Sequence, residues 1–257
     1  MGTLQENQVI RGRVESMLQE TLTEAYRNIR CASEQSLCWF LFRGAGTWKS
    51  INLLYDATEA DTAWGKAISN DCGALLRTLW DTFIQAGYVF ADPAERDARG
   101  ELYLNYLAVE KHMQSLAVVA LNTKFSQQIA SSPLRVEGEK DNQREFDKVK
   151  HKYESNPKAS GKTTIRKHWY RGDLRSLSKA IGCENEYISF VVSLNGSTHA
   201  GPSAIKYGCP IRGESTWVFA AMLVCRIARM VVDNGALSVS SDANEIINAF
   251  QQDPLQF

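Results

Sequence analysis

Apolar side chains recur at helical spacing along most of the chain. Apolar positions three, four and seven residues apart predict amphipathic helices, whereas the alternation that would indicate strands is hard to find. The expected helices lie at residues 6–31, 33–57, 68–90, 93–120, 173–181, 185–200, 215–233 and 243–251. The sequence therefore predicts an all-α fold, a single-domain multi-helix bundle of about seven to nine helices over residues 1–257.

The helix expected at residues 68–90 has two faces of different character. Its apolar face is expected to enter the core and carries Ile68, Cys72, Leu75, Leu76, Leu79, Phe83 and Phe90. Its polar face carries Asn70, Arg77, Asp81, Gln85 and Tyr88. The segment at residues 215–233 is instead apolar nearly all round, which predicts a central buried helix.

The pattern weakens between residues 131 and 164, where apolar residues become sparse and charges alternate. This stretch is either an exposed helix with a flexible tail or a long connection across the domain surface, and a domain boundary here is the alternative to a single domain. We expect residues 138–164 to be a flexible charged connection, the mobile basic segment of the bundle.

Charge and cysteine content narrow the class of protein. The 29 basic and 29 acidic residues cancel, so any attraction to nucleic acid must be local. The six cysteines show no paired spacing, which indicates free thiols in a reducing compartment. The polar start has no signal-peptide core, and the longest apolar run, residues 217–224, is too short to span a bilayer. We expect a cytoplasmic protein that does not enter a membrane.

Three segments carry a resemblance to a known family. They are LLRTLWD, with Arg77 and Asp81; HWYRGDLRSLSKAIG, from His168; and YISFVVSLNGSTHAG, with His199. Their order and spacing over residues 51–208 resemble the bacterial family called domain of unknown function 5677. The resemblance implies a helical fold, a bacterial or phage origin and no particular reaction.

A looser resemblance connects the chain to HEPN-type modules, the helical nucleotide-binding and ribonuclease modules of prokaryotic defence and toxin systems. Their ribonuclease site uses an Arg four to six residues before a His. The six residues before His199 include no Arg, so that signature is absent.

Arg77, Asp81 and His199 are the candidate catalytic residues. Arg77 and Asp81 are four residues apart on one helix and can form an ion pair. His199 falls in the last turn before Gly201, where the helix end favours a cation. A pair on a solvated surface and a helix-capping histidine are the structural alternatives. If these residues are functional, His199 is a general acid/base or a substrate anchor, and all three converge in space.

A basic stretch supplies candidate substrate-binding residues. Residues 148–179 contain ten Lys or Arg and two acidic residues, a local charge of +8, with aromatic residues interleaved. Phosphate contacts and base stacking require these residue types, although such runs are often only solvated. The candidates are Lys162, Arg166, Lys167, Trp169 and Arg171, together with Asn195 and Ser197 beside His199.

No histidine pair has metal-ligand spacing, so we expect no metal site, and the sequence identifies no cofactor. Two functions stay open. One is an effector or accessory protein of a bacterial antiphage defence or toxin-like system that acts on RNA or a nucleotide. The other is a non-catalytic helical module that binds a protein partner encoded in the same operon. An oligomer is compatible with either function.

Overall fold

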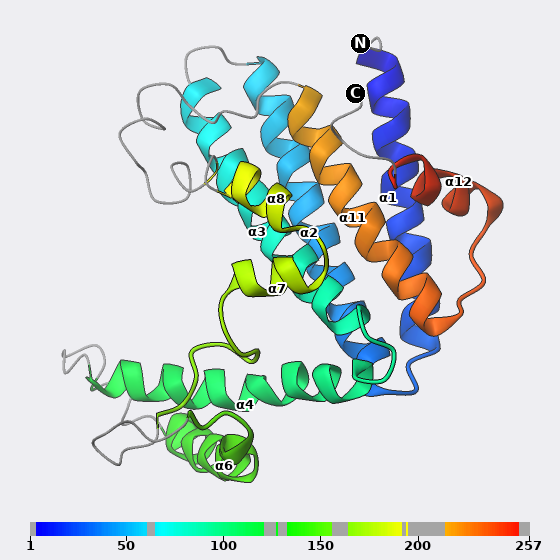
Figure 1. Cartoon of the computed structure of the whole chain (residues 1–257). Coiled ribbons are helices and arrows are strands. Elements are labelled where there is room, and N and C mark those ends of the chain that lie inside the picture. Colours follow the sequence, from blue (N-terminus) through cyan, green and yellow to red (C-terminus); the bar gives the residue numbers. More distant parts are fainter. Residues whose placement is uncertain are drawn as a thin grey trace. The chain divides into compact units, whose positions relative to one another are not determined.

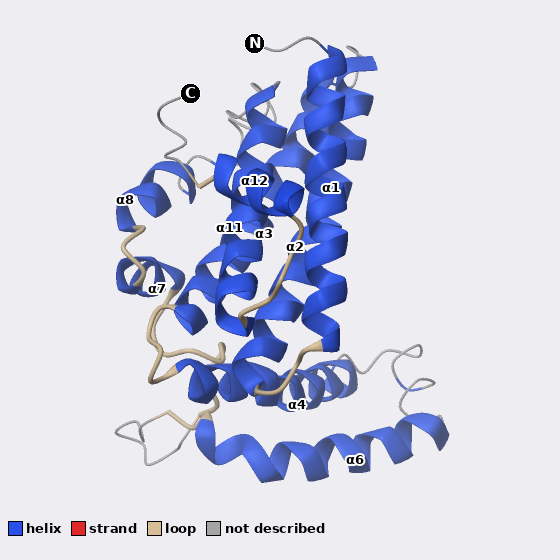
Figure 2. Cartoon of the chain, turned by 90° about the vertical axis from the view of Figure 1, so that its right-hand side faces the viewer, coloured by secondary structure: helices blue, strands red, loops and turns tan. Residues whose placement is uncertain are grey.

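The chain is mostly helical in the part that the structure describes, which is residues 4–60, 65–120, 127, 133–155, 164–191, 194 and 214–251 of a computed structural model. Figure 2 shows helices and loops there and no strand, and one isolated β-bridge joins Glu154 to Ile165. The long helices are α1 (Leu4–Arg27), α2 (Ala32–Ala60), α3 (Gly65–Phe90), α4 (Arg96–Ala120), α6 (Pro133–Val149) and α11 (Glu214–Gly235). The short ones are η1 (Lys150–Lys152), α7 (Leu174–Ala180), α8 (Glu184–Glu186), η2 (Tyr187–Val191) and α12 (Ser241–Ala249). The predicted all-α class is confirmed.

The chain divides into two compact units. The first comprises Met1–Gly100 and Gly172–Phe257, and the second comprises Glu101–Arg171. We call them the bundle unit and the α4/α6 unit. The expectation of a single domain stays a prediction.

The core of the bundle unit forms where α2, α3 and α11 pack against one another (Figure 1), with α1 and α12 covering α11. Trp48, Trp80 and Leu79 are at most 1% exposed in this core. Along α11, twelve of the sixteen residues from Trp217 to Val232 are buried, so the predicted central helix is confirmed. Burying an apolar side chain of this size stabilises a fold by about 1.5–3 kcal/mol, so this layer dominates the stability of the unit.

One part of α11, Ser215–Gly235, is long and apolar enough to cross a membrane by length and composition. About 72% of its most apolar stretch is buried inside the protein, between the other helices of the bundle. In this fold the apolar side chains of α11 therefore form part of the core.

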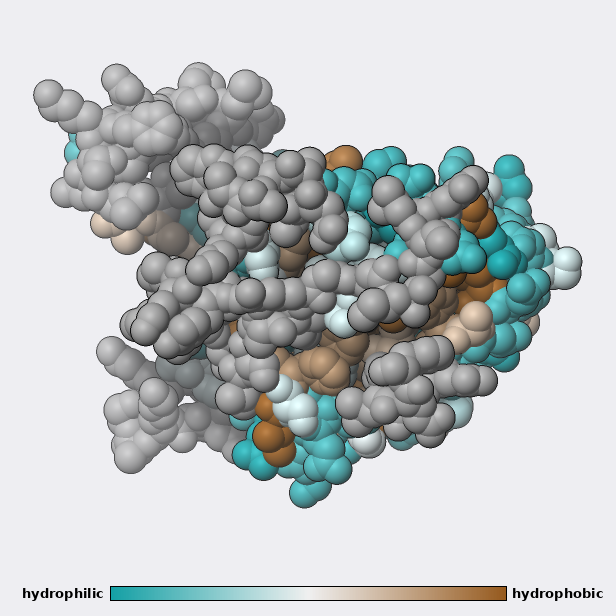
Figure 3. All heavy atoms as spheres, turned by 90° about the horizontal axis from the view of Figure 1, so that it is seen from above, coloured by the Kyte–Doolittle hydropathy of each residue, from teal (hydrophilic) through white to brown (hydrophobic). Residues whose placement is uncertain are grey.

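On the face seen in Figure 3, hydrophilic side chains cover much of the described periphery and hydrophobic side chains lie between them.

A polar junction fixes the start of α2. The Ser33 backbone N–H donates to Asp97 Oδ1 at 3.1 Å, and Asn234 Nδ2 donates to Ser33 Oγ at 3.1 Å. Arg96 Nη1 in turn donates to Asn234 Oδ1 at 3.2 Å. Gly100 lies so close to this point that a Cβ there would sit 2.6 Å from the carbonyl carbon of Ala32. The junction therefore requires a residue without a side chain at position 100.

The α4/α6 unit has a small aromatic core of its own. Tyr153 is fully buried and its hydroxyl donates to the Leu102 carbonyl at 2.5 Å. Burial raises the pKa of the Tyr153 phenol well above its ordinary value, so the hydroxyl stays a protonated donor. The Tyr106 ring packs edge-on against Tyr153, and the His112 ring stacks on Phe146 at 4.0 Å.

The predicted flexible connection at residues 138–164 is helical over much of its described length. Residues 138–149 belong to α6 and Lys150–Lys152 to η1, so the exposed-helix alternative holds there. Phe146 is the reason, because its burial anchors an otherwise charged helix. Residues 156–163 lie outside the described part of the chain.

Replacing Gly100 by Ala should destabilise the protein by about 1–3 kcal/mol, because the new methyl group meets backbone that cannot rotate away. Gly12 in α1 is the matched control, since a Cβ there would meet nothing within 4 Å. Gly12→Ala should stabilise α1 by up to about 1 kcal/mol through helix propensity. Urea unfolding followed by circular dichroism measures both changes. Equal effects at the two positions would contradict the close approach at Gly100.

Candidate functional site

Arg77 and Asp81 form an ion pair one turn apart on α3, as their spacing predicts. Their side chains are 12% and 29% exposed, whereas the i,i+4 pair Arg229–Asp233 on α11 is 41% and 39% exposed. The alternative of a fully solvated surface pair therefore fails. A half-buried ion pair adds little to stability, because desolvation offsets much of the attraction between the charges.

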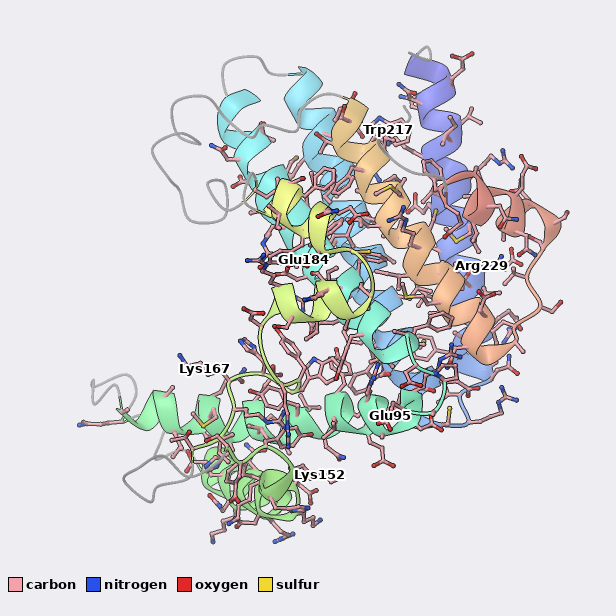
Figure 4. The ribbon with its side chains drawn as sticks, in the orientation of Figure 1. Glu95, Lys152, Lys167, Glu184, Trp217 and Arg229 are labelled. Carbon is pink, nitrogen blue, oxygen red and sulfur yellow. The ribbon has the colours of Figure 1, made fainter. Side chains whose placement is uncertain are left out.

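A π-helix covers this pair. The short helix α8 runs directly into η2, and Figure 4 shows Glu184 of α8 in front of α3. The Tyr187 ring, first in η2, lies 5.9 Å from the Arg77 guanidinium carbon, within cation–π range. π-helical turns are rare and occur often at functional sites. The combination of a π-helix and a half-buried charge pair singles out this position.

Aromatic stacking holds η2 in place. The Phe190 ring stacks on Phe219 of α11 at 4.3 Å and lies 5.6 Å from Trp80 of α3. Trp80 also stacks on Phe219 at 5.8 Å with the two rings nearly parallel. Three elements far apart in the sequence thus meet in one aromatic cluster, and Tyr187 is positioned over Arg77 by the same helix that carries Phe190.

Trp80 adds a buried donor next to the charge pair. The residue is 1% exposed, and its indole N–H hydrogen-bonds to no described residue. Buried donors without a partner are uncommon because each costs about 1–3 kcal/mol. Trp80 follows Arg77 by three residues, so these two positions are neighbours along α3, although the Trp80 ring packs into the core against Phe190 and Phe219.

The other residues proposed around this site cannot be placed. His199, Asn195 and Ser197 lie outside the described residues, so the convergence of His199 with Arg77 and Asp81 stays a prediction. Leu194, immediately before Asn195, is fully buried. In the described part of the chain, no group of three His, Cys, Asp or Glu residues could hold a metal ion.

The basic stretch is partly used by the protein itself. Trp169 is 3% exposed and packs edge-on against Tyr103, so neither of its ring faces is open for a base in this conformation. Arg166 donates to the Lys152 carbonyl at 2.5 Å and lies 5.4 Å from the Tyr153 ring centre. These two residues hold the α4/α6 unit together. Lys162 lies outside the described residues.

Several other described cations of the stretch are exposed. Lys167 and Arg171 are exposed and form no ion pair with a described residue. Lys148 pairs with Glu145 at 2.6 Å and Lys150 with Asp147 at 2.7 Å, so the charge count along the sequence overstates the local positive field. Exposed pairs of this kind are worth at most about 1 kcal/mol and can exchange for phosphate.

The charge of the whole chain is nevertheless divided unevenly. Residues 101–171 contain thirteen Lys or Arg and eight Asp or Glu. The rest of the chain contains sixteen Lys or Arg and twenty-one Asp or Glu. The α4/α6 unit therefore carries a net charge of +5 and the bundle unit −5, which cancel in the full sequence. Of the two units, the α4/α6 unit therefore has the charge that favours a polyanion.

Sequence reasoning gave no functional role to Trp80, Tyr187 or the π-helix. Trp80 stands inside the LLRTLWD segment, and its position between Arg77 and Asp81 was the available signal. The π-helix had no such signal, because an extra residue in a helical turn does not alter composition or apolar spacing enough to be recognised.

Comparison with known proteins gives one match. The model of the family described as "Family of unknown function (DUF5677)" matches residues 43–208, more than half of the chain. These residues include Arg77, Asp81, Tyr187 and every other predicted site residue. No curated protein and no solved structure matches the chain. The looser resemblance to HEPN-type modules is not confirmed and stays a prediction.

Replacing Asp81 by Asn should cost about 1–2 kcal/mol of unfolding free energy, because Arg77 loses its counter-charge in a half-buried setting. Asp233→Asn is the matched control on the same i,i+4 geometry, and its more exposed pair should change stability by less than about 0.5 kcal/mol. Urea titration of both variants provides the comparison. If the two variants lose the same stability, the Arg77–Asp81 pair is no more buried than a surface pair.

Proposed function

The chain belongs to DUF5677, a family of unknown function, and from that premise we propose that it binds RNA or a nucleotide at the Arg77–Asp81 site. The observation that carries the proposal is the half-buried Arg77, paired with Asp81 and covered by the Tyr187 ring of a π-helix.

Arginine suits a phosphate ligand at this position. Its planar guanidinium donates two parallel hydrogen bonds to phosphate oxygens, and partial burial strengthens them relative to water. Asp81 restrains the guanidinium before the ligand arrives, which reduces the entropy lost on binding. The phosphate must carry enough charge to compete with this carboxylate, which favours a terminal nucleotide phosphate or an RNA backbone over a neutral ligand.

Aromatic groups nearby fit the base of such a ligand. Tyr187 offers a ring that can stack on a nucleobase, an interaction worth about 1–3 kcal/mol in single-stranded complexes. His199, as a general acid/base, would add a reaction to binding, and this role is part of the proposal.

The α4/α6 unit supports RNA as the larger ligand. Its net charge of +5 provides the sequence-independent attraction, with Lys167 and Arg171 as exposed phosphate contacts. The proposal includes a cytoplasmic role in a bacterial defence or toxin-like system, which rests on the looser resemblance to HEPN-type modules. Function as a non-catalytic interaction module is the second candidate, the alternative that the sequence left open.

Replacing Arg77 by Lys should weaken binding of a fluorescent single-stranded RNA or a fluorescent ATP analogue by about 10-fold. Lysine keeps the charge but cannot donate two parallel hydrogen bonds to one phosphate, a difference of about 1.4 kcal/mol. Arg229→Lys is the control, because Arg229 pairs with Asp233 at the same spacing but lies away from α8 (Figure 4). Fluorescence anisotropy measures both. Binding that is equal for wild type and Arg77→Lys places the ligand elsewhere.

Replacing both Lys167 and Arg171 by Ser should flatten the salt dependence of RNA binding without changing that of the ATP analogue. For a single strand, each cation that no longer neutralises a phosphate reduces the slope of log K against log salt by about 0.7. Lys49→Ser in the bundle unit removes an equally exposed cation and should leave the slope unchanged. Identical slopes for all three proteins would remove the α4/α6 unit from the RNA interface.

A further inference from the structure

An apolar groove of about 760 Å³ lies open between α1 and α2 in the bundle unit. α1 contributes Leu18, Leu22 and Tyr26, α2 contributes Phe42 and Ala45, and Leu75 of α3 forms part of the floor. Phe42 is 61% exposed and Tyr26 is 49% exposed. Leu53, 66% exposed, extends the Phe42 edge of α2 by three turns.

This surface is large for a monomer. Exposed single apolar residues are ordinary, but several on adjoining faces of two helices form a patch that usually marks an interaction site. Two neighbouring helices with an apolar furrow between them accept an amphipathic helix with apolar side chains three, four and seven residues apart. The groove rim carries Arg43, whose guanidinium forms no ion pair with any described residue. A fitting helix should therefore bring an acidic residue.

The same chain exposes a helix with these properties. On α4, Met113 is 49% exposed and Leu116 is 51% exposed, and Ala117 is exposed beside them. Glu110, one turn before Met113, is exposed and forms no ion pair with any described residue. The spacing of Glu110, Met113 and Ala117 places an acid and two apolar side chains along one face.

We propose that the chain forms a homodimer in which α4 of each copy occupies the α1/α2 groove of the other, with Glu110 facing Arg43. Charge complementarity selects a second copy as the occupant. At the contact, an uncompensated acid meets an uncompensated cation, and at longer range the α4/α6 unit of net charge +5 meets the bundle unit of net charge −5. Each copy carries both surfaces, so a second copy can supply the helix for the groove and the groove for the helix. The proposal is independent of the Arg77 site.

Sedimentation velocity of the full chain over a range of concentrations tests the dimer. Wild type is expected to sediment as a dimer, and Phe42→Asp should weaken self-association at least about 10-fold, because a carboxylate enters the apolar interface. Val9→Asp is the control, since Val9 is 59% exposed on α1 but does not line the groove. Circular dichroism of each variant verifies folding.

A charge exchange identifies the partner surface. Arg43→Glu and Glu110→Arg should each dissociate the dimer when alone, because like charges then face each other. Mixed in equal amounts, the two variants should associate again, since a heterodimer pairs the exchanged charges at one contact and the native charges at the other. Three results would overturn the proposal: a wild-type monomer at all concentrations, open assemblies larger than a dimer, or no recovery of association on mixing.

Discussion

The packing of α3 between α2 and α11 is the constraint on which the candidate site depends. α3 buries Leu76, Leu79 and Ile84 completely in this layer, and Trp80 extends it toward Phe219 of α11. A helix clamped in this way cannot rotate about its own axis without losing several buried apolar side chains, each worth about 1.5–3 kcal/mol. The direction in which Arg77 and Asp81 point from α3 is therefore set by the buried apolar residues of the same helix.

The aromatic cluster of Trp80, Phe190 and Phe219 places Tyr187 over Arg77. Phe190 of η2 stacks on the Trp80 and Phe219 rings, so the π-helix is held by apolar contacts and Tyr187 lies over Arg77 as a consequence. The charge pair itself contributes little net stability, because desolvation opposes its attraction. A fold that retains a half-buried ion pair, a π-turn and an unsatisfied indole donor together has features that packing alone does not explain. These features motivate the proposal that a ligand binds here.

The two compact units have different physical characters. The bundle unit has a large aliphatic and aromatic core and a net negative charge, whereas the α4/α6 unit has a small aromatic core and a net positive charge. In the smaller unit, residues that would otherwise suit RNA binding are used for cohesion, since Trp169 and Arg166 pack against Tyr103 and Tyr153. Among the described cations of this unit, Lys167 and Arg171 are exposed and are not used in this way.

The sequence by itself determined the helical class, the central position of α11 and the pairing of Arg77 with Asp81, because these follow from periodicity and from the four-residue spacing on a helix. It also identified the family from three short segments. Only the tertiary structure decided that the pair is half-buried and that Tyr187 of a π-helix lies over Arg77. It also decided that Trp169 is buried and that several lysines of the basic stretch pair with acids of α6 and α4. The physical reason is that helical spacing specifies which side chains share a face, whereas burial depends on which distant segment packs against that face.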